Sequence, residues 1–241
     1  MAKLYMGFDA GTQSVKVAVY DENFNPVASH SLPTTLHYPQ PGWVQMNIDE
    51  FLNITVECMK KTVDAIKGKG YSPSDIVAVM GDGIICGICG VDKNGKAVTP
   101  YINYLDSRTQ ADVDAINAKN LDIWGRETGN PEANCMFPAM FARWFLANSE
   151  DFRQKGVKFV HNAPYILMNL AGLKGKDAFI DWGAMSGWGL GYKVEKKEWS
   201  DEQLDILGID KKYMPRILKP WDIVGGVSEE MAARTGLIAG T

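Results

Sequence analysis

Near the start of the chain stands the stretch that decides the fold, Gly7-Phe8-Asp9-Ala10-Gly11-Thr12-Gln13-Ser14. The apolar residues at its start predict a strand that ends at Asp9, and a second apolar run follows at residues 15–20. Glycine in the turn between the two runs lets the backbone come close to another group. Successive backbone N–H groups in such a turn form a concave anion site. The stretch therefore predicts two strands joined by an anion-binding turn.

The side chains around this turn suit a nucleotide and a hard cation. Asp9, at the tip of the strand, offers the oxygen ligands that Mg²⁺ prefers. The candidate phosphate-binding residues are Gly11, Thr12, Gln13, Ser14 and Lys16. From the local pattern alone, a plain hairpin turn explains these residues equally well, because short glycine motifs are common. The sequence lacks the Walker A pattern G-x-x-x-x-G-K-[ST].

The rest of the chain reads as strands followed by helices. Further strands are expected at residues 27–32, 76–80 and 86–91. A long helix is expected from Asn47 to Gly68, and a second one, capped by Ser107, at residues 109–118. The other expected helices are residues 138–148, residues 164–170 and two short ones after Ser200 and Ser228. Strands joined by short turns at the start predict an antiparallel meander. The pattern indicates one α/β domain with helical additions.

Composition excludes several classes of protein. The 241 residues are 46% hydrophobic and 22% charged, which is ordinary for a globular domain and excludes a disordered chain. A net charge of −4 argues against nucleic acid as the main partner. No apolar run reaches the ~18 residues of a membrane helix, and no secretory signal is recognisable at the start. We therefore expect a cytoplasmic protein with no membrane partner.

Four cysteines and three histidines bear on redox and metal chemistry. Cys86 and Cys89 form a C-x-x-C pattern, but they lie in a strand-like run where positions three apart face opposite ways. A redox pair normally opens a helix, so this function is disfavoured. The histidines are distant in sequence from the cysteines and from one another, and a metal cluster is not expected.

With these elements in view, the sequence resembles a known family. Asp-x-Gly-Thr between two opening strands is similar to the phosphate loop of the actin, Hsp70 and sugar-kinase superfamily, and most similar to the FGGY carbohydrate kinases, which include xylulose, ribulose and glycerol kinases. The resemblance continues in family order through residues 41–45, 104–108, 127–130, the helix around Trp144, residues 199–202 and the Pro215 segment. Each segment is a weak match alone, whereas the ordered set spans essentially the whole chain.

The resemblance implies a ribonuclease H-like α/β fold with a mixed sheet and helical insertions. It implies that residues 1–241 form the N-terminal, sugar-binding domain, and that the C-terminal ATP-binding domain is absent from this chain. The implied activity is ATP-dependent phosphorylation of a sugar or polyol hydroxyl, as in pentulose kinases such as xylulose kinase. ATP and Mg²⁺ are the implied cofactors. A small sugar or polyol is the implied partner, and a homodimer of the intact protein is left open.

Several residues are candidates for the sugar site. They are Trp43 as an apolar wall, and Gln45, Asp82, Gly83, Cys86, Asp106 and Arg108. For Asp106 and Arg108 the alternative is a local ion pair that organises the start of a helix. For Trp43 the alternative is an aromatic side chain packed within a loop.

The sequence also departs from the family. Residues 82–87 stand where xylulose kinases carry a Ser-Gly-Gln-Met-His-Gly type segment, so that Ile84 and Cys86 replace the sugar-facing Gln and His. This puts D-xylulose in doubt and leaves another ketose or polyol open. Gln45 replaces a Glu of the family, and Phe141 replaces a Lys.

The family's general base is an aspartate of a Gly-Asp pair. Here the only such pair, at residues 81–82, lies far upstream, and the base is expected beyond Thr241. The catalytic residue is therefore unknown, and the isolated chain is expected to be inactive. The alternative is a non-catalytic module of the same fold that senses a sugar or a phosphate. An actin-like ATPase or chaperone lobe is disfavoured by residues 42–44 and 106–108, which those relatives lack.

Overall fold

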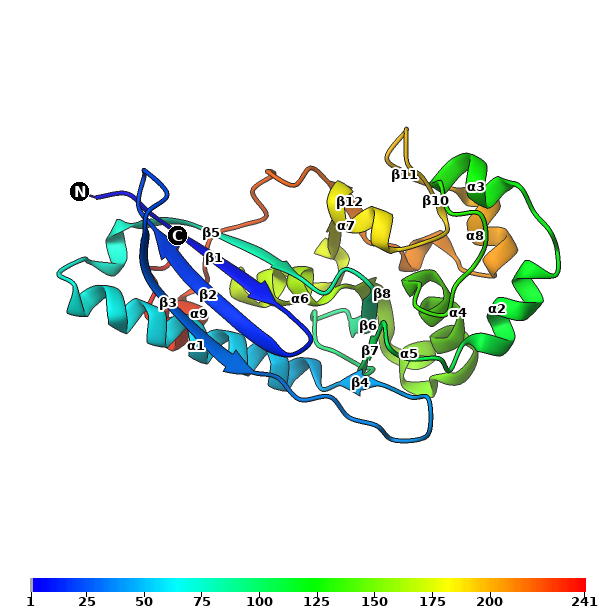
Figure 1. Ribbon diagram of the computed structural model, residues 1–241, viewed down its shortest axis with the longest axis horizontal. Helices are drawn as coiled ribbons and strands as arrows, with labels where there is room; N and C mark the ends of the chain where they lie inside the picture. The colour runs from blue at the N-terminus through cyan, green and yellow to red at the C-terminus, as the bar shows by residue number, and fades with distance from the viewer. Residues whose placement is uncertain (1) are drawn as a thin grey trace.

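The opening strands build the first of two four-stranded sheets in the computed structural model, which describes residues 2–241 (Figure 1). Strands β1 (Leu4–Ala10), β2 (Ser14–Tyr20) and β3 (Pro26–Pro33) form an antiparallel meander, and β5 (Ile76–Gly83) pairs with β1 in parallel. The order is β3-β2-β1-β5. Alternate residues of β1 are buried, as the period of a strand requires. The expected meander and mixed sheet are confirmed.

Helix α1 (Ile48–Gly68) packs along this sheet, mainly against β2 and β3 (Figure 1). It begins as predicted at Asn47, whose side chain accepts hydrogen bonds from the backbone N–H groups of Asp49 and Glu50. Its apolar stripe is buried at helical spacing and forms the first core together with the sheet.

The second sheet has the order β4-β7-β6-β8, with β4 (Gln45–Met46), β7 (Tyr101–Asn103), β6 (Gly87–Asp92) and β8 (Gly156–Val160). It separates two apolar cores. In β6, Ile88 belongs to the second core, whereas Cys89 and Val91 belong to the first. Because successive side chains of a strand point to opposite faces, each face of this sheet serves one core. This arrangement explains why β6 is buried almost throughout.

The second core lies between this sheet and the helices gathered at the far end of the molecule (Figure 1). The remaining helices are α2 (Gln110–Asn117), α3 (Ile123–Thr128), α4 (Pro138–Asn148), α5 (Glu150–Lys155), α6 (Asn162–Leu170), α7 (Trp182–Gly187), α8 (Asp201–Leu207) and α9 (Glu229–Thr235). The remaining strands are β9 (Phe179–Asp181), β10 (Tyr192–Lys193), β11 (Glu198–Trp199) and β12 (Arg216–Leu218). The predicted helix at 138–148 is confirmed.

The start of α2 differs from the prediction. Ser107 does not cap this helix, because its hydroxyl donates to the carbonyl of Gly42 (3.2 Å) and ties down the preceding loop instead. The helix begins at Gln110, after Thr109, which forms no side-chain cap hydrogen bond. The Thr109 hydroxyl donates to the Cys135 carbonyl (3.3 Å). Both hydroxyls are therefore used by tertiary contacts, which local sequence does not reveal.

The outer edge of β5 has no partner strand in the described part of the chain. Apolar side chains stand open to solvent there: Met80 is 70% exposed and Trp221 is 69% exposed. Both line a groove of about 610 Å³ that also touches Leu170 and Thr241. No helix within residues 2–241 combines the length and the apolarity needed to cross a bilayer.

Candidate functional site

The candidate site is centred on the turn between β1 and β2. Asp9 ends β1, and Lys16 lies opposite it in the register of β2. The Lys16 ammonium is 3.5 Å from the Asp9 carboxylate, with 64% and 49% of the two side chains exposed. An ion pair this exposed contributes little to stability. Both charges therefore remain available to a ligand that approaches from solvent.

Backbone hydrogen bonds hold the turn in shape. The Gly11 N–H donates to the Ser14 carbonyl (3.1 Å), and the Thr34 N–H donates to the Gln13 carbonyl (3.1 Å). The Thr34 hydroxyl donates to the carbonyl of Thr12 (2.6 Å). Within residues 2–241 the N–H groups of Thr12 and Gln13 have no such partner. The carbonyl groups of the turn thus accept hydrogen bonds within the protein, whereas the N–H groups of Thr12 and Gln13 remain free to donate to an anion. A backbone anion site requires such free N–H groups.

A cavity of about 360 Å³ brings this turn together with residues of the predicted sugar site. Its lining consists of Asp9, Gly11, Thr12, Gly83, Ile84, Ile85, Cys86, Tyr104 and Met136. The phosphate-binding candidates come from the first sheet, whereas Tyr104 follows β7 of the second. The cavity therefore lies where the two sheets meet.

Asp82 is the register partner of Asp9 on the adjacent parallel strand, so the two carboxylates project from the same face of the sheet. One oxygen of Asp82 accepts the N–H of Gly83 (2.7 Å). At Gly83 a Cβ would lie 2.9 Å from the Ala10 carbonyl and from the Asn162 side chain, whose amide donates to that carbonyl (2.6 Å). Glycine at this position is required for α6 to approach the end of β1 so closely.

Cys86 lines the cavity just before β6 and donates weakly to the Gly187 carbonyl (3.3 Å). Burial raises its pKa, so the group is a neutral thiol at pH 7. Cys89 lies fully buried in the first core, and burial raises its pKa strongly. All four cysteines are free in the described residues. This geometry lends no support to a redox pair.

Asp106 and Arg108 form a buried ion pair, with side chains 0% and 2% exposed. The guanidinium donates to both oxygens of Asp106 at 2.8–3.0 Å, and the carboxylate also accepts the N–H groups of Val44 (2.6 Å) and Arg108 (2.8 Å). The guanidinium carbon lies 3.8 Å from the ring centre of Trp43 and 4.9 Å from that of Trp144. The structure thus places these residues in a packed cluster, and their contact with a sugar stays a prediction.

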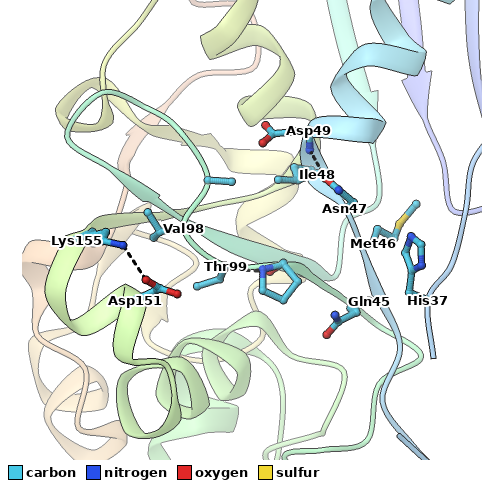
Figure 2. Close-up of a pocket in the computed structure, with 12 residues that line it drawn as sticks. His37, Gln45, Met46, Asn47, Ile48, Asp49, Val98, Thr99, Asp151 and Lys155 are labelled. Carbon is cyan, nitrogen blue, oxygen red and sulfur yellow. Dashed lines mark hydrogen bonds and ion pairs between the residues drawn. The ribbon is translucent and has the colours of Figure 1, made fainter. Parts of the chain in front are cut away.

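Gln45 belongs to the same cluster, because its side-chain oxygen accepts from the Arg108 guanidinium (3.2 Å). It also lines a different cavity of about 620 Å³, shown in Figure 2, which lies between β4 and α5. His37 stands on one side of that cavity and the Asp151–Lys155 ion pair on the other (Figure 2). The predicted sugar residues are therefore separated: Gly83 and Cys86 line the Asp9 cavity, whereas Trp43, Gln45, Asp106 and Arg108 form the packed cluster. Asp82 lines neither place.

Some residues that line the Asp9 cavity were not predicted from the sequence to be site residues. Tyr104 and Met136 are both partly exposed and form an apolar rim. Tyr104 carried a usable signal, because it is an aromatic residue directly after a buried strand in a family-like segment. Met136 lies in a loop more than thirty residues later, and nothing in its local sequence indicates the contact.

The residues around the β1–β2 turn suit a magnesium ion whose ligands are mostly water and phosphate oxygens. No group of three or more His, Cys, Asp or Glu side chains gathers as a metal site within residues 2–241. Mg²⁺ commonly takes one or two carboxylates and completes its shell with water and phosphate oxygens. Asp9, half exposed beside a turn with open N–H groups, suits that arrangement.

Comparison with known proteins identifies the family of the chain. The N-terminal domain of the FGGY family of carbohydrate kinases matches residues 4–241, and the chain belongs to that family. Glycerol kinase 2 of Thermotoga maritima is 28% identical over 241 residues, which cover 95% of this chain and 46% of that protein. A glycerol kinase of Saccharolobus islandicus is 27% identical over 239 residues, which cover 95% of this chain and 45% of that protein. The chain thus spans about half the length of these curated relatives.

Solved structures confirm the fold. A xylulose kinase from Rhodospirillum rubrum superposes with a TM-score of 0.88 at 20% identity, over 99% of this chain and 47% of that one. A gluconate kinase from Lactobacillus acidophilus gives 0.86 at 23% identity, over 100% and 47%. The expected ribonuclease H-like α/β fold is confirmed by these neighbours.

Proposed function

We propose that this chain is the sugar-binding half of an ATP-dependent kinase that phosphorylates a hydroxyl of a sugar or polyol. One observation carries the proposal: a single cavity is lined by Asp9, Gly11 and Thr12 of the anion-binding turn and by Gly83 and Cys86 of the sugar-facing segment. A donor phosphate and an acceptor hydroxyl must meet for phosphoryl transfer, and this cavity offers one place for both.

Phosphoryl transfer depends mainly on positioning and on neutralising charge. The open N–H groups of Thr12 and Gln13 would orient phosphate oxygens, and the Lys16 ammonium would add positive charge beside them. Asp9 would hold Mg²⁺, which supplies further charge neutralisation when bound. Cys86 and Tyr104 would shape the acceptor side of the cavity.

The proposal includes a second lobe. Because the matched relatives are about twice as long as the matched region, we propose that the adenine site and the general base come from residues outside this chain. On that view the 241 residues alone bind an acceptor weakly and do not turn over.

Replacing Asp9 by Asn in the two-lobed protein tests the metal assignment. We expect kcat to fall at least about a hundredfold, because a neutral amide is a poorer ligand for the Mg²⁺ that would neutralise charge on the phosphates. Circular dichroism and melting temperature should stay unchanged, since the side chain is half exposed. Asp64→Asn is the matched control, because Asp64 is a similarly exposed carboxylate paired with lysines on α1. Near-normal turnover of Asp9→Asn would remove Asp9 from the metal role.

Identification of the acceptor requires a panel. Coupled ADP release by the two-lobed protein should be measured with ATP and with ketoses, aldoses and polyols in turn. Turnover with one neutral acceptor supports the proposed function. Binding of an acceptor without any ADP release would favour the sensing module instead.

A further inference from the structure

The lining of the Asp9 cavity has two parts of different chemistry. One part is the anion-binding turn, which contributes Asp9, Gly11 and Thr12. The other part, which we call the apolar wall, consists of Gly83, Ile84, Ile85, Cys86, Tyr104 and Met136. Among these described residues no side chain carries a charge or an amide, and their only polar side-chain groups are a phenol and a thiol. The wall is therefore poor in partners for a hydroxyl group.

The apolar wall is open to solvent. Ile85 is 49% exposed, and Tyr104 and Met136 are each 38% exposed. They come from three separate segments: one between β5 and β6, one after β7, and the loop before α4. Exposed apolar side chains that gather at one place are typical of a binding site, whereas single ones are not. Because three segments converge here, one apolar run in the sequence does not explain the wall.

Several polar groups of the wall already have partners within the protein. The Cys86 thiol donates to the Gly187 carbonyl (3.3 Å). The Ile84 N–H donates to the Ala10 carbonyl (3.2 Å), and the Ile84 carbonyl accepts from the Tyr101 hydroxyl (3.4 Å). A ligand hydroxyl pressed against these groups gives up hydrogen bonds to water and regains few of them. A methyl group at the same place loses no hydrogen bond and buries apolar surface.

We propose that the acceptor carries a methyl group that packs on the apolar wall while its reacting hydroxyl faces Asp9 and the anion-binding turn. The acceptor is then a deoxy sugar or a deoxy polyol, in which CH₃ stands at a position where the parent compound has CH₂OH. A cavity of about 360 Å³ suits a small molecule of this kind. This inference rests on the proposed function, because it takes the Asp9 cavity as the site of phosphoryl transfer.

Binding to the 241-residue chain tests the wall without any turnover. Propylene glycol and glycerol are matched probes, because propylene glycol has CH₃ where glycerol has CH₂OH. In ¹H–¹³C spectra of the methionine methyl groups, propylene glycol should shift the Met136 resonance more than glycerol does at the same concentration. The Met80 methyl is the internal control, since Met80 is 70% exposed but lies outside this cavity.

Two results of this titration would overturn the inference. One is an equal shift of the Met136 resonance with the two compounds, or no shift up to molar concentration. The other is a shift with propylene glycol that is as large at Met80 as at Met136, which would indicate contact with any exposed methionine.

Kinetics of the two-lobed protein test the same preference during catalysis. The matched pairs are L-fucose with L-galactose, L-rhamnulose with L-fructose, and propylene glycol with glycerol. In each pair of which a member is phosphorylated, we expect kcat/KM to be at least about tenfold higher for the deoxy member. For any other acceptor that the protein phosphorylates, the same comparison is made with the compound that exchanges CH₃ and CH₂OH. An equal or reversed preference would contradict the inference.

A polar side chain in the wall should weaken this preference. Met136→Gln keeps nearly the same size and adds an amide that binds hydroxyl groups, so the ratio of the two kcat/KM values should fall about threefold or more. Met80→Gln is the matched control and should keep the wild-type ratio, because Met80 lies outside the cavity. An unchanged ratio in Met136→Gln, with an unchanged melting temperature, would remove Met136 from the acceptor site.

The two measurements separate this inference from the proposed function. A two-lobed protein that phosphorylates no acceptor, while propylene glycol still shifts the Met136 resonance more than glycerol does, would overturn the proposed function and support the wall. Preference for the parent sugar would support the kinase and overturn the wall. A Met136 resonance that responds to propylene glycol in the 241-residue chain but not in the two-lobed protein would show that the second lobe covers the wall, which also overturns the inference.

Discussion

At the scale of the residue, His161 shows how burial changes chemistry. Sequence analysis considered it only as a metal ligand, because a lone histidine carries no other local signal. In the folded chain it is only 2% exposed and packs edge-on against Trp188, and its pKa falls from the ordinary value near 6.5 to about 3. Its neutral state is a product of the fold, which no local sequence pattern encodes.

This pKa predicts acid sensitivity. Between about pH 6.5 and pH 3 the unfolded chain binds a proton at His161 and the folded chain does not, so the free energy of unfolding falls as the pH falls through this window. The slope from this one group is at most about 1.4 kcal/mol per pH unit. Urea unfolding at several pH values should show a shallower acid slope for His161→Gln.

At the scale of the element, the cluster around Arg108 fastens a long loop to the second sheet. The loop before β4 reaches the cluster through Trp43, and β4 itself contributes Gln45. Asp106 belongs to the segment that follows β7. The sequence suggested an ion pair here as one alternative, and the pair is present. Its burial was not predictable, because it depends on Trp144 of α4, which lies 36 residues after Arg108 in the sequence.

Arg108→Lys should loosen this loop. Lysine keeps the charge but loses the two-pronged contact with Asp106 and the stacking on Trp43, so we expect a loss of roughly 1–3 kcal/mol in unfolding free energy. Limited proteolysis should cut the exposed residues 38–42 faster than in the wild type. Arg153→Lys is the control, because that arginine pairs with Glu150 at the surface. Unchanged proteolysis of Arg108→Lys would show that the loop is held by other contacts.

At the scale of the whole molecule, two apolar cores share the second sheet as a common wall. The sequence predicted strands first and helices later, and this order is confirmed. It did not predict two cores, because the four residues Ile88 to Val91 read as one uniformly apolar run. Only the positions of β6 between β7 and β8, and of the helices around them, assign alternate residues to opposite cores.

A shared wall predicts a single unfolding transition. Gly90→Ala should lower the unfolding free energy by about 1–3 kcal/mol, because its Cβ would collide with the Phe152 ring. Fluorescence of Trp124 and Trp188, in the second core, and thiol exposure of Cys58, in the first, should still change together. Gly68→Ala is the control, since a Cβ there meets no atom within 4 Å. Separate midpoints for the two probes would refute the coupling.

The candidate site was partly accessible from sequence. Asp9, Gly11 and Thr12 could be grouped because they are neighbours in the chain, and they do line one cavity. Gly83 and Cys86 were placed by resemblance to a family, and they line the same cavity. The remaining sugar candidates rested on residue type alone, which cannot separate a side chain that faces a ligand from one saturated by its own protein, as Asp106 is.

The open side of β5 has a practical consequence for anyone who purifies this chain. An unpaired strand flanked by exposed apolar side chains can associate with other copies of the chain. Preparations should therefore form soluble aggregates as they are concentrated. A positive charge on that strand would oppose such association. Met80→Lys should therefore raise the concentration at which light scattering still reports a monomer, whereas a lysine at the exposed Phe24, on the opposite side of the sheet, should not.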